Sequence, residues 1–225
     1  MKIYNLKDEA TNDGSKRRLV ITELKQGVKN PDRVNVFVDA KFAFSLDVAQ
    51  VVDYKLKVGR EISEDELAEL KKASEFGKLY QRTLEWALSR PRSAKETRDY
   101  LYKKVFEKKL DKNYIDNIIE KLISKKYLDD KVFAEWWVEN RFVKKGVSSK
   151  RLKMELMKKG IASDIINEAL GGRDDEQEID KIIAKKRAKY PDDEKLIAYL
   201  TRQGFSYELA REKVVLHGTD SQNWG

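Results

Sequence analysis

The sequence has 225 residues, with 47 lysines and arginines against 39 aspartates and glutamates, which gives a net charge of +8. It has no cysteine and a single histidine, His217. Disulfides, thiolate metal sites and a cysteine nucleophile are therefore excluded, and a histidine-rich metal site or a serine–histidine–aspartate triad is disfavoured. The sequence contains no nucleotide-binding glycine motif, so we expect no catalytic centre, no metal and no cofactor.

Neither the N-terminus nor the interior suggests a membrane segment. Residues 1–9 lack the apolar stretch of a secretory signal, and no later segment approaches the ~18 consecutive apolar residues of a membrane span. We therefore expect a soluble, cytoplasmic monomer with no membrane partner.

The first part of the chain, residues 1–60, has the pattern of a small β-sheet. Residues 18–25 are largely β-branched and apolar, and residues 35–39 and 41–46 alternate apolar with polar side chains. This pattern predicts three antiparallel strands, the last two joined by a tight turn at Asp39 and Ala40. Asp47 is expected to begin a short helix over Val48, Val51 and Val52, and Gly59 to end that helix.

After Gly59 the pattern becomes helical. Residues 63–66, Ser-Glu-Asp-Glu, form a capping box that begins a helix running to about Ser89, before Pro91. Each further helix is predicted from a short polar residue before an amphipathic segment and a glycine or proline after it. A sheet followed by helices indicates two unlike parts and a mainly α fold.

Segments 149–161 and 193–205 match at a spacing of 44 residues. Leucines at i and i+4 form one apolar stripe, a glycine ends the helix in a left-handed conformation, and the next apolar residue packs back on the stripe. The matched positions are Leu152 with Leu196, Leu156 with Leu200, Gly160 with Gly204, and Ile161 with Phe205.

A weaker third copy lies at 95–106. There Leu101 takes the second leucine position and Phe106 the Ile161 position, whereas Thr97 and Val105 replace the first leucine and the glycine. We therefore predict three tandem three-helix, helix-turn-helix-like repeats: 61–128 with a lead-in helix, 129–171, and 172–217, followed by a flexible tail at 218–225.

The segment Tyr127–Ala134 connects the first repeat to the second. Either Asp129 or Asp130 can cap the following helix; a metal site is the disfavoured alternative, because no third acid stands at a ligand spacing.

In the helix that follows Asp130, Phe133 and Trp137 share one face. Trp136 is assigned to the core, with an aromatic contact to a base or a partner protein as the alternative.

The positive charge is concentrated in one part of the chain. Residues 90–159 carry 21 basic residues against 11 acidic ones, a net charge of +10. A polyanion or an acidic groove on a protein is the predicted partner of this basic window, and a solvated lysine-rich face is the alternative. Its candidate binding residues are Arg141, Lys144, Lys145, Lys150, Arg151, Lys153, Lys158 and Lys159, together with Lys103, Lys104, Lys108 and Lys109.

Three segments together resemble the RecX family of bacterial recombination regulators over about residues 76–216. They are Leu84–Phe106, the Tyr-Leu-Asp-Asp run that contains Leu128 with Phe133 and Ala134 after it, and the Lys-Lys-Gly-Ile run that ends at Ile161. The resemblance implies a non-catalytic protein that binds RecA and RecA–single-stranded-DNA filaments. It also implies inhibition of their recombinase, ATPase and coprotease activities in recombination and the SOS response.

Two other functions remain as alternatives. One is non-specific DNA binding by the helix-turn-helix-like repeats, and weak direct DNA binding could also accompany filament binding. The other is an enzyme, the least favoured reading, because no residue is singled out as catalytic.

Overall fold

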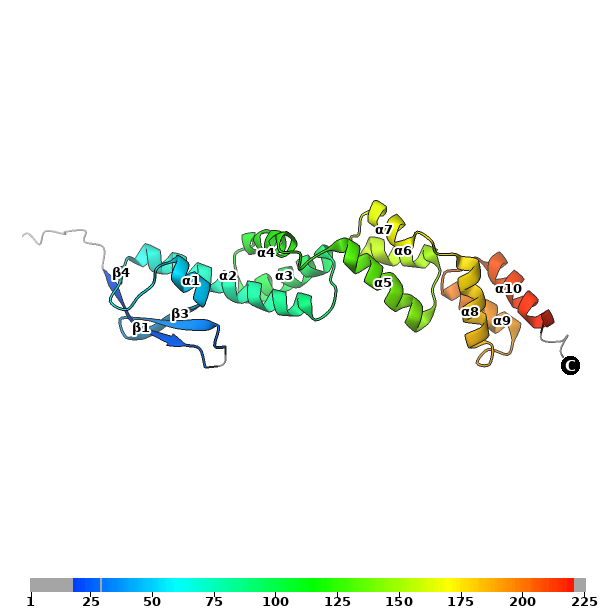
Figure 1. Cartoon of the computed structure of the whole chain (residues 1–225), viewed down its shortest axis with the longest axis horizontal. Helices are drawn as coiled ribbons and strands as arrows, with labels where there is room; N and C mark the ends of the chain where they lie inside the picture. The colour runs from blue at the N-terminus through cyan, green and yellow to red at the C-terminus, as the bar shows by residue number, and fades with distance from the viewer. Residues whose placement is uncertain (1–17, 29, 221–225) are drawn as a thin grey trace, which may run out of the picture. The chain divides into compact units, whose positions relative to one another are not determined.

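The computed structural model describes residues 18–28 and 30–220, with the backbone alone at 142–145 and 219–220. Over these residues a small N-terminal antiparallel sheet is followed by helices, which confirms the predicted mainly α fold (Figure 1). The chain divides into two compact units, residues 1–81 and 82–225. The division falls inside the long helix α2 (Glu64–Leu88), whose first turn is capped by the Ser63 hydroxyl, 3.1 Å from the Glu66 amide nitrogen.

The sheet of the first unit has the strand order β3-β2-β1-β4, and all its pairs are antiparallel. The strands are β1 (Leu19–Gln26), β2 (Arg33–Val38), β3 (Lys41–Asp47) and β4 (Glu61–Ile62). Asp39 and Ala40 both have positive φ, +48° and +61°, which suits the tight hairpin turn predicted at this position. The two-residue strand β4 was not predicted, because it is too short to show alternation.

One face of this sheet is the core of the first unit. Ile21, Val36 and Leu46 are fully buried there, and they cluster with Leu70 from α2. The short helix α1 (Val48–Asp53) begins at Asp47 as predicted, in a capping box with Gln50, but it ends at Asp53 and not at Gly59. Period-two alternation therefore produced a sheet with one buried face, which α2 covers.

The second unit contains three helical groups (Figure 1). The first comprises the end of α2 with α3 (Ala94–Lys108) and α4 (Asn113–Ser124). The second comprises α5 (Asp130–Lys145), α6 (Ser149–Lys158) and α7 (Ser163–Leu170). The third comprises α8 (Asp175–Lys186), α9 (Asp193–Arg202) and α10 (Tyr207–Asp220). The second and third groups each have a separate apolar core.

The matched repeat positions of α6 and α9 are equivalent in the structure. The glycines that follow these helices, Gly160 and Gly204, have φ of +79° and +97°. The residue after each glycine donates its amide back to the helix, Ile161 to the Leu156 carbonyl and Phe205 to that of Leu200. The leucines of both stripes are fully buried: Leu152, Leu156, Leu196 and Leu200.

The alignment predicted for the first group is wrong by one helical turn, as the 86% exposure of Phe106 shows. Helix α3 has 15 residues and α6 has 10. When the two helices are aligned at their first residues, the predicted end of α3 therefore falls one turn before its real end. The left-handed position is Lys109, at φ +53°, and Leu110 donates its amide to the Val105 carbonyl at 3.0 Å. Leu110 therefore takes the place assigned to Phe106, Val105 takes that of the second leucine, and Leu101 takes that of the first.

Thr97, which was predicted at the first leucine position, lies one turn before it and is fully buried in α3. Its hydroxyl donates to the Ser93 carbonyl at 3.0 Å, so the polar side chain is satisfied inside its own helix. Leu101 is fully buried, and Val105 and Leu128 are buried with it. The first group thus has an intact core despite its weaker sequence match.

Candidate interaction surface

The basic window does not form one free cationic surface, because several of its members bind carboxylates of the chain itself. Arg141 makes two hydrogen bonds to Glu155, at 2.8 and 2.5 Å. Arg151 also contacts Glu155, at 3.4 Å, and its guanidinium donates to the Arg202 carbonyl. Arg141 therefore joins α5 to α6 within the second group, Arg151 links the second group to the third, and neither arginine is free to bind a partner.

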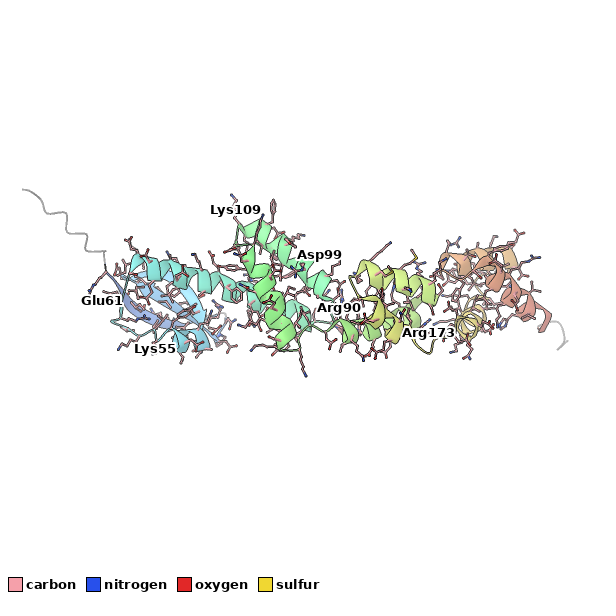
Figure 2. The ribbon with its side chains drawn as sticks, turned by 90° about the horizontal axis from the view of Figure 1, so that it is seen from above. Lys55, Glu61, Arg90, Asp99, Lys109 and Arg173 are labelled. Carbon is pink, nitrogen blue, oxygen red and sulfur yellow. The ribbon has the colours of Figure 1, made fainter. Side chains whose placement is uncertain are left out.

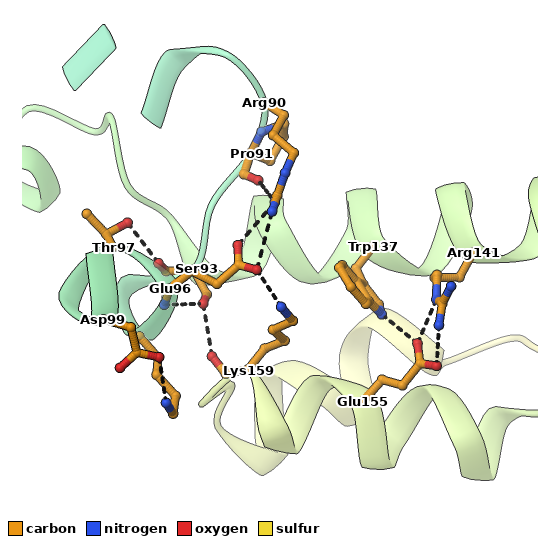
Figure 3. Close-up of polar contacts among 11 residues, drawn as sticks. Arg90, Pro91, Ser93, Glu96, Thr97, Asp99, Trp137, Arg141, Glu155 and Lys159 are labelled. Atoms are coloured by element: carbon orange, nitrogen blue, oxygen red, sulfur yellow. Dashed lines mark hydrogen bonds and ion pairs between the residues drawn. The ribbon is translucent and has the colours of Figure 1, made fainter. Parts of the chain in front are cut away.

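Glu155 is the centre of this cluster, with only 17% of its side chain exposed (Figure 3). It also accepts a hydrogen bond from the Trp137 ring nitrogen at 3.1 Å. Burial by itself would raise the pKa of Glu155, but the bonds from Arg141, Trp137 and Arg151 outweigh it and hold the pKa below the usual value.

A second carboxylate, Glu96, lies between the first and second helical groups (Figure 3). Its side chain is 14% exposed and contacts Arg90 at 3.1 Å and Lys159 at 2.5 Å. Burial opposes ionisation here too, but both cations lower the pKa of Glu96 below its ordinary value. Lys159, a predicted partner-binding residue, is therefore part of an internal ion pair.

The aromatic rings of α5 lie beneath these cations. The Arg90 guanidinium is 5.2 Å from the centre of the Trp136 ring, and the Lys159 ammonium is 5.1 Å from that of Trp137. Trp136 also packs on the fully buried Phe133, with ring centres 6.1 Å apart. Trp136 is therefore a partly buried residue of this junction, which agrees with its assignment to the core.

Asp129 and Asp130 each cap a helix, but not the same one. Asp129 accepts the Lys131 amide at 2.8 Å and so caps its own helix, α5. Asp130 instead accepts the Ala94 amide at 2.8 Å, at the first residue of α3 in the preceding group. Burial, with Asp129 adding to it, raises the pKa of Asp130 against the opposing effect of the Ala94 amide.

The same arrangement recurs at the next junction. Asp174 caps α8 through the Glu176 amide at 2.8 Å. Asp175 reaches back to the preceding group, where it accepts both the amide and the hydroxyl of Ser149, at 2.9 and 2.7 Å. An Asp-Asp pair therefore links each helical group to the one before it. Both pairs stand in the sequence, but only the fold shows that the second aspartate belongs to another helix.

Two glycines complete these junctions. A Cβ on Gly160 would lie 2.8 Å from the Cβ of Lys95, in the first group. A Cβ on Gly204 would lie 2.8 Å from that of Arg151, in the second group. Each glycine thus provides both a left-handed helix end and the close approach of the preceding group's helix.

Three lysines of the basic window remain on an exposed face of α6: Lys150, Lys153 and Lys158. Met154 and Met157 lie on the same face and are 52% and 55% exposed. We call these five residues the α6 face. The predicted residues Lys144 and Lys145 have side chains outside the described residues.

The lysines of the first group lie toward the end of α3. Lys103, Lys108 and Lys109 are exposed there, and Lys109 lies at the end of α3 remote from Arg90 (Figure 2). Lys104 is paired with Glu107 at 3.0 Å. Partial burial, together with the nearby charges of Arg82 and Lys104, lowers the pKa of Lys108, as expected in a positive environment.

Neither a metal site nor a membrane-spanning helix is present in the described part of the chain. No group of three histidine, cysteine, aspartate or glutamate side chains there is placed to hold a metal ion. No described helix is long and apolar enough to cross a membrane.

A sheet followed by linked three-helix groups places the chain in the class of helical-repeat proteins. Two family models match the chain: "Regulatory protein RecX N-terminal domain" at residues 19–63, and "RecX, second three-helix domain" at residues 129–170. Curated relatives extend the similarity over most of the chain.

The regulatory protein RecX of Bacillus pumilus is 31% identical over 211 residues, which is 90% of this chain and 78% of that protein. The RecX of Bacillus subtilis is 32% identical over 84% of this chain and 74% of its own length. The chain therefore belongs to the RecX family, whose members are regulatory proteins and not enzymes.

Solved structures agree with this fold. A crystal structure of regulatory protein RecX superposes with a TM-score of 0.67 at 22% identity, over 85% of this chain and 96% of the other. The RecX structure from Lactobacillus salivarius gives a TM-score of 0.52 at 26% identity, over 64% of this chain and 97% of the other.

Proposed function

We propose that this protein binds a RecA-type recombinase filament and lowers its activity, through the exposed lysines of the α6 face. The observation that carries the proposal is the separation of the basic window into two kinds of residue. Arg141, Arg151 and Lys159 are held in ion pairs with Glu155 and Glu96, whereas the α6 lysines point away from the core. Membership of a regulatory family supports the same function.

The electrostatics favour an anionic partner. Exposed lysines contribute little to the stability of their own fold, so a cluster of them on one helix face is available for a partner. A filament that combines protein carboxylates with DNA phosphates matches that charge, and the contact would weaken as salt screens it.

The test is the single-stranded-DNA-dependent ATPase of the cognate recombinase, with this protein titrated in at fixed moderate salt. We expect the rate to fall at substoichiometric amounts of the protein, as capping or disassembly of a filament requires. No fall in rate, together with tight binding to DNA alone, would contradict the proposal.

A second candidate function, non-specific binding of DNA, is supported by one observation on α3. Tyr102 and the 86% exposed Phe106 are four residues apart on the exposed side of that helix, close in sequence to Lys103 and Lys109. Aromatic rings among lysines suit single-stranded nucleic acid, whose bases stack on the rings. Substitution of Phe106 by serine would then weaken binding to oligothymidylate without changing filament inhibition.

A further inference from the structure

A groove lies between α6 and the turn that follows α9. Its lining includes Lys150, Met154 and Lys158 from α6, and Thr201 and Phe205 from the third group. Met154 is half exposed, whereas Phe205 is buried beneath the surface. The groove therefore combines an apolar floor with cationic residues at both ends of the α6 face.

The other two charged residues of the groove, Arg151 and Glu155, are bound within the chain. Glu155 pairs with both Arg141 and Arg151, and Arg151 also donates to the Arg202 carbonyl. The exposed Lys150 and Lys158 therefore carry the charge most available to a ligand. These lysines are eight residues apart, with Met154 midway between them on the same face.

We propose that this groove binds an acidic segment of a protein partner, with an apolar side chain of that segment on Met154 and its carboxylates at Lys150 and Lys158. The proposal rests on the proposed function, because it adds the partner's chemistry to the same helix face. A methionine surface suits such a contact, since its flexible thioether adapts to differently shaped apolar side chains.

A protein segment fits the groove better than a nucleic acid does. Bases bind to single-strand sites chiefly by stacking on exposed aromatic rings. Among the described residues that line the groove, the one aromatic side chain is Phe205, and it is only 3% exposed. The apolar floor therefore offers a contact for an aliphatic side chain but no platform for a base.

The test uses the full chain and two short fluorescein-labelled peptides made of aspartate and glutamate, one with a central leucine and one with serine in its place. Fluorescence anisotropy should show tighter binding of the leucine peptide. The double variant Lys150→Glu/Lys158→Glu should weaken that binding roughly tenfold or more. Met154→Ser should remove the preference for leucine, and the control Lys125→Glu/Lys185→Glu, with the same change in charge at exposed sites outside the groove, should bind as the wild type does.

Equal binding of both peptides by the wild type, or full binding by the double variant, would overturn the proposal. Displacement of the peptide by a lower concentration of oligothymidylate than of unlabelled peptide would also overturn it, in favour of a nucleic-acid site.

The recombinase ATPase assay distinguishes failure of the groove proposal from failure of the proposed function. If the wild type binds the leucine peptide but leaves the ATPase unchanged, the proposed function fails and the groove assignment stands. If Met154→Ser loses the peptide preference but inhibits fully, the groove's role in filament binding fails alone.

Discussion

Glu96 and Glu155 are largely buried carboxylates that each hold more than one cation. A buried ion pair is costly to desolvate, and removal of one partner leaves the other charge uncompensated. Glu96 joins the first group to the second, whereas Glu155 joins α5 to α6 and positions Arg151, which contacts the third group. Both residues therefore act on the arrangement of helices as well as on local stability.

The pKa shifts of the two glutamates predict acid sensitivity. In the folded state the pKa of each carboxyl group lies below 4.5, the ordinary value for a glutamate in an unfolded chain. Just below pH 4.5, both groups are therefore more ionised in the folded state than in the unfolded state. Their stabilisation is therefore complete above about pH 4.5 and is lost as the pH falls through the lower folded-state values.

The double variant Glu96→Gln/Glu155→Gln should be less stable than the wild type at pH 7, but its urea midpoint should fall less between pH 5 and pH 3. Glu120→Gln, at an exposed position on α4, serves as the control. If the urea midpoint falls equally between pH 5 and pH 3 in the wild type and the double variant, these carboxylates do not set the pH dependence of stability.

Comparison of two glycine-to-alanine variants distinguishes the cost of backbone strain from the cost of a steric clash. Gly160→Ala and Gly172→Ala both place an L residue at positive φ, a cost of about 1 kcal/mol each. Only Gly160 would also meet another group, because the space around Gly172 is open. We expect Gly160→Ala to lower the free energy of unfolding by at least about 1 kcal/mol more than Gly172→Ala does. Equal losses in urea melts would mean that the close approach to Lys95 has no energetic weight.

At the scale of elements, the distinctive feature is that each helical group completes the helix ends of the group before it. Asp130 caps α3 and Asp175 caps α6, so the exposed amides at two helix starts are satisfied from the next group. In an array in which neighbours supply each other's caps, unfolding of one group destabilises the next.

This coupling can be tested by comparing two aspartates. Asp175→Ala removes a cap between groups, whereas Asp192→Ala removes a cap within the third group, on α9. Each loss should cost about 1 kcal/mol. Only Asp175→Ala should cause the third group to exchange its amide hydrogens independently of the second. Equal exchange patterns in the two variants would contradict the proposed coupling.

The elements themselves were largely predictable, because alternation and 3.6-residue periodicity are local. The Asp39–Ala40 turn, the Asp47 cap and the glycine-ended leucine stripes of α6 and α9 all follow from short segments. The junctions were not predictable in the same way, since Asp130 and Ala94 are 36 residues apart in sequence. Phe106 was misplaced because a single sequence does not show that α3 is longer than α6 by more than a helical turn.

At the scale of the whole molecule, net charge was a poor guide to the binding surface. The +10 window includes Arg141, Arg151 and Lys159, whose charges are used inside the fold. Pairing between distant residues, which composition cannot reveal, reduces the described α6 part of the window to Lys150, Lys153 and Lys158. The exposed cations are therefore fewer than the sequence suggests, and those of α6 lie on one face of that helix.

The central claim, that these three lysines contact the filament, is tested most directly by charge reversal in the recombinase ATPase assay. Lys150→Glu/Lys153→Glu/Lys158→Glu is compared with Lys57→Glu/Lys125→Glu/Lys185→Glu, which makes the same change in net charge at exposed sites elsewhere. Circular dichroism should show native helix content in both. We predict that the first variant loses inhibition, with a midpoint raised roughly tenfold or more, and that the second inhibits as the wild type does. Full inhibition by the first variant, or equal loss in both, would contradict the account.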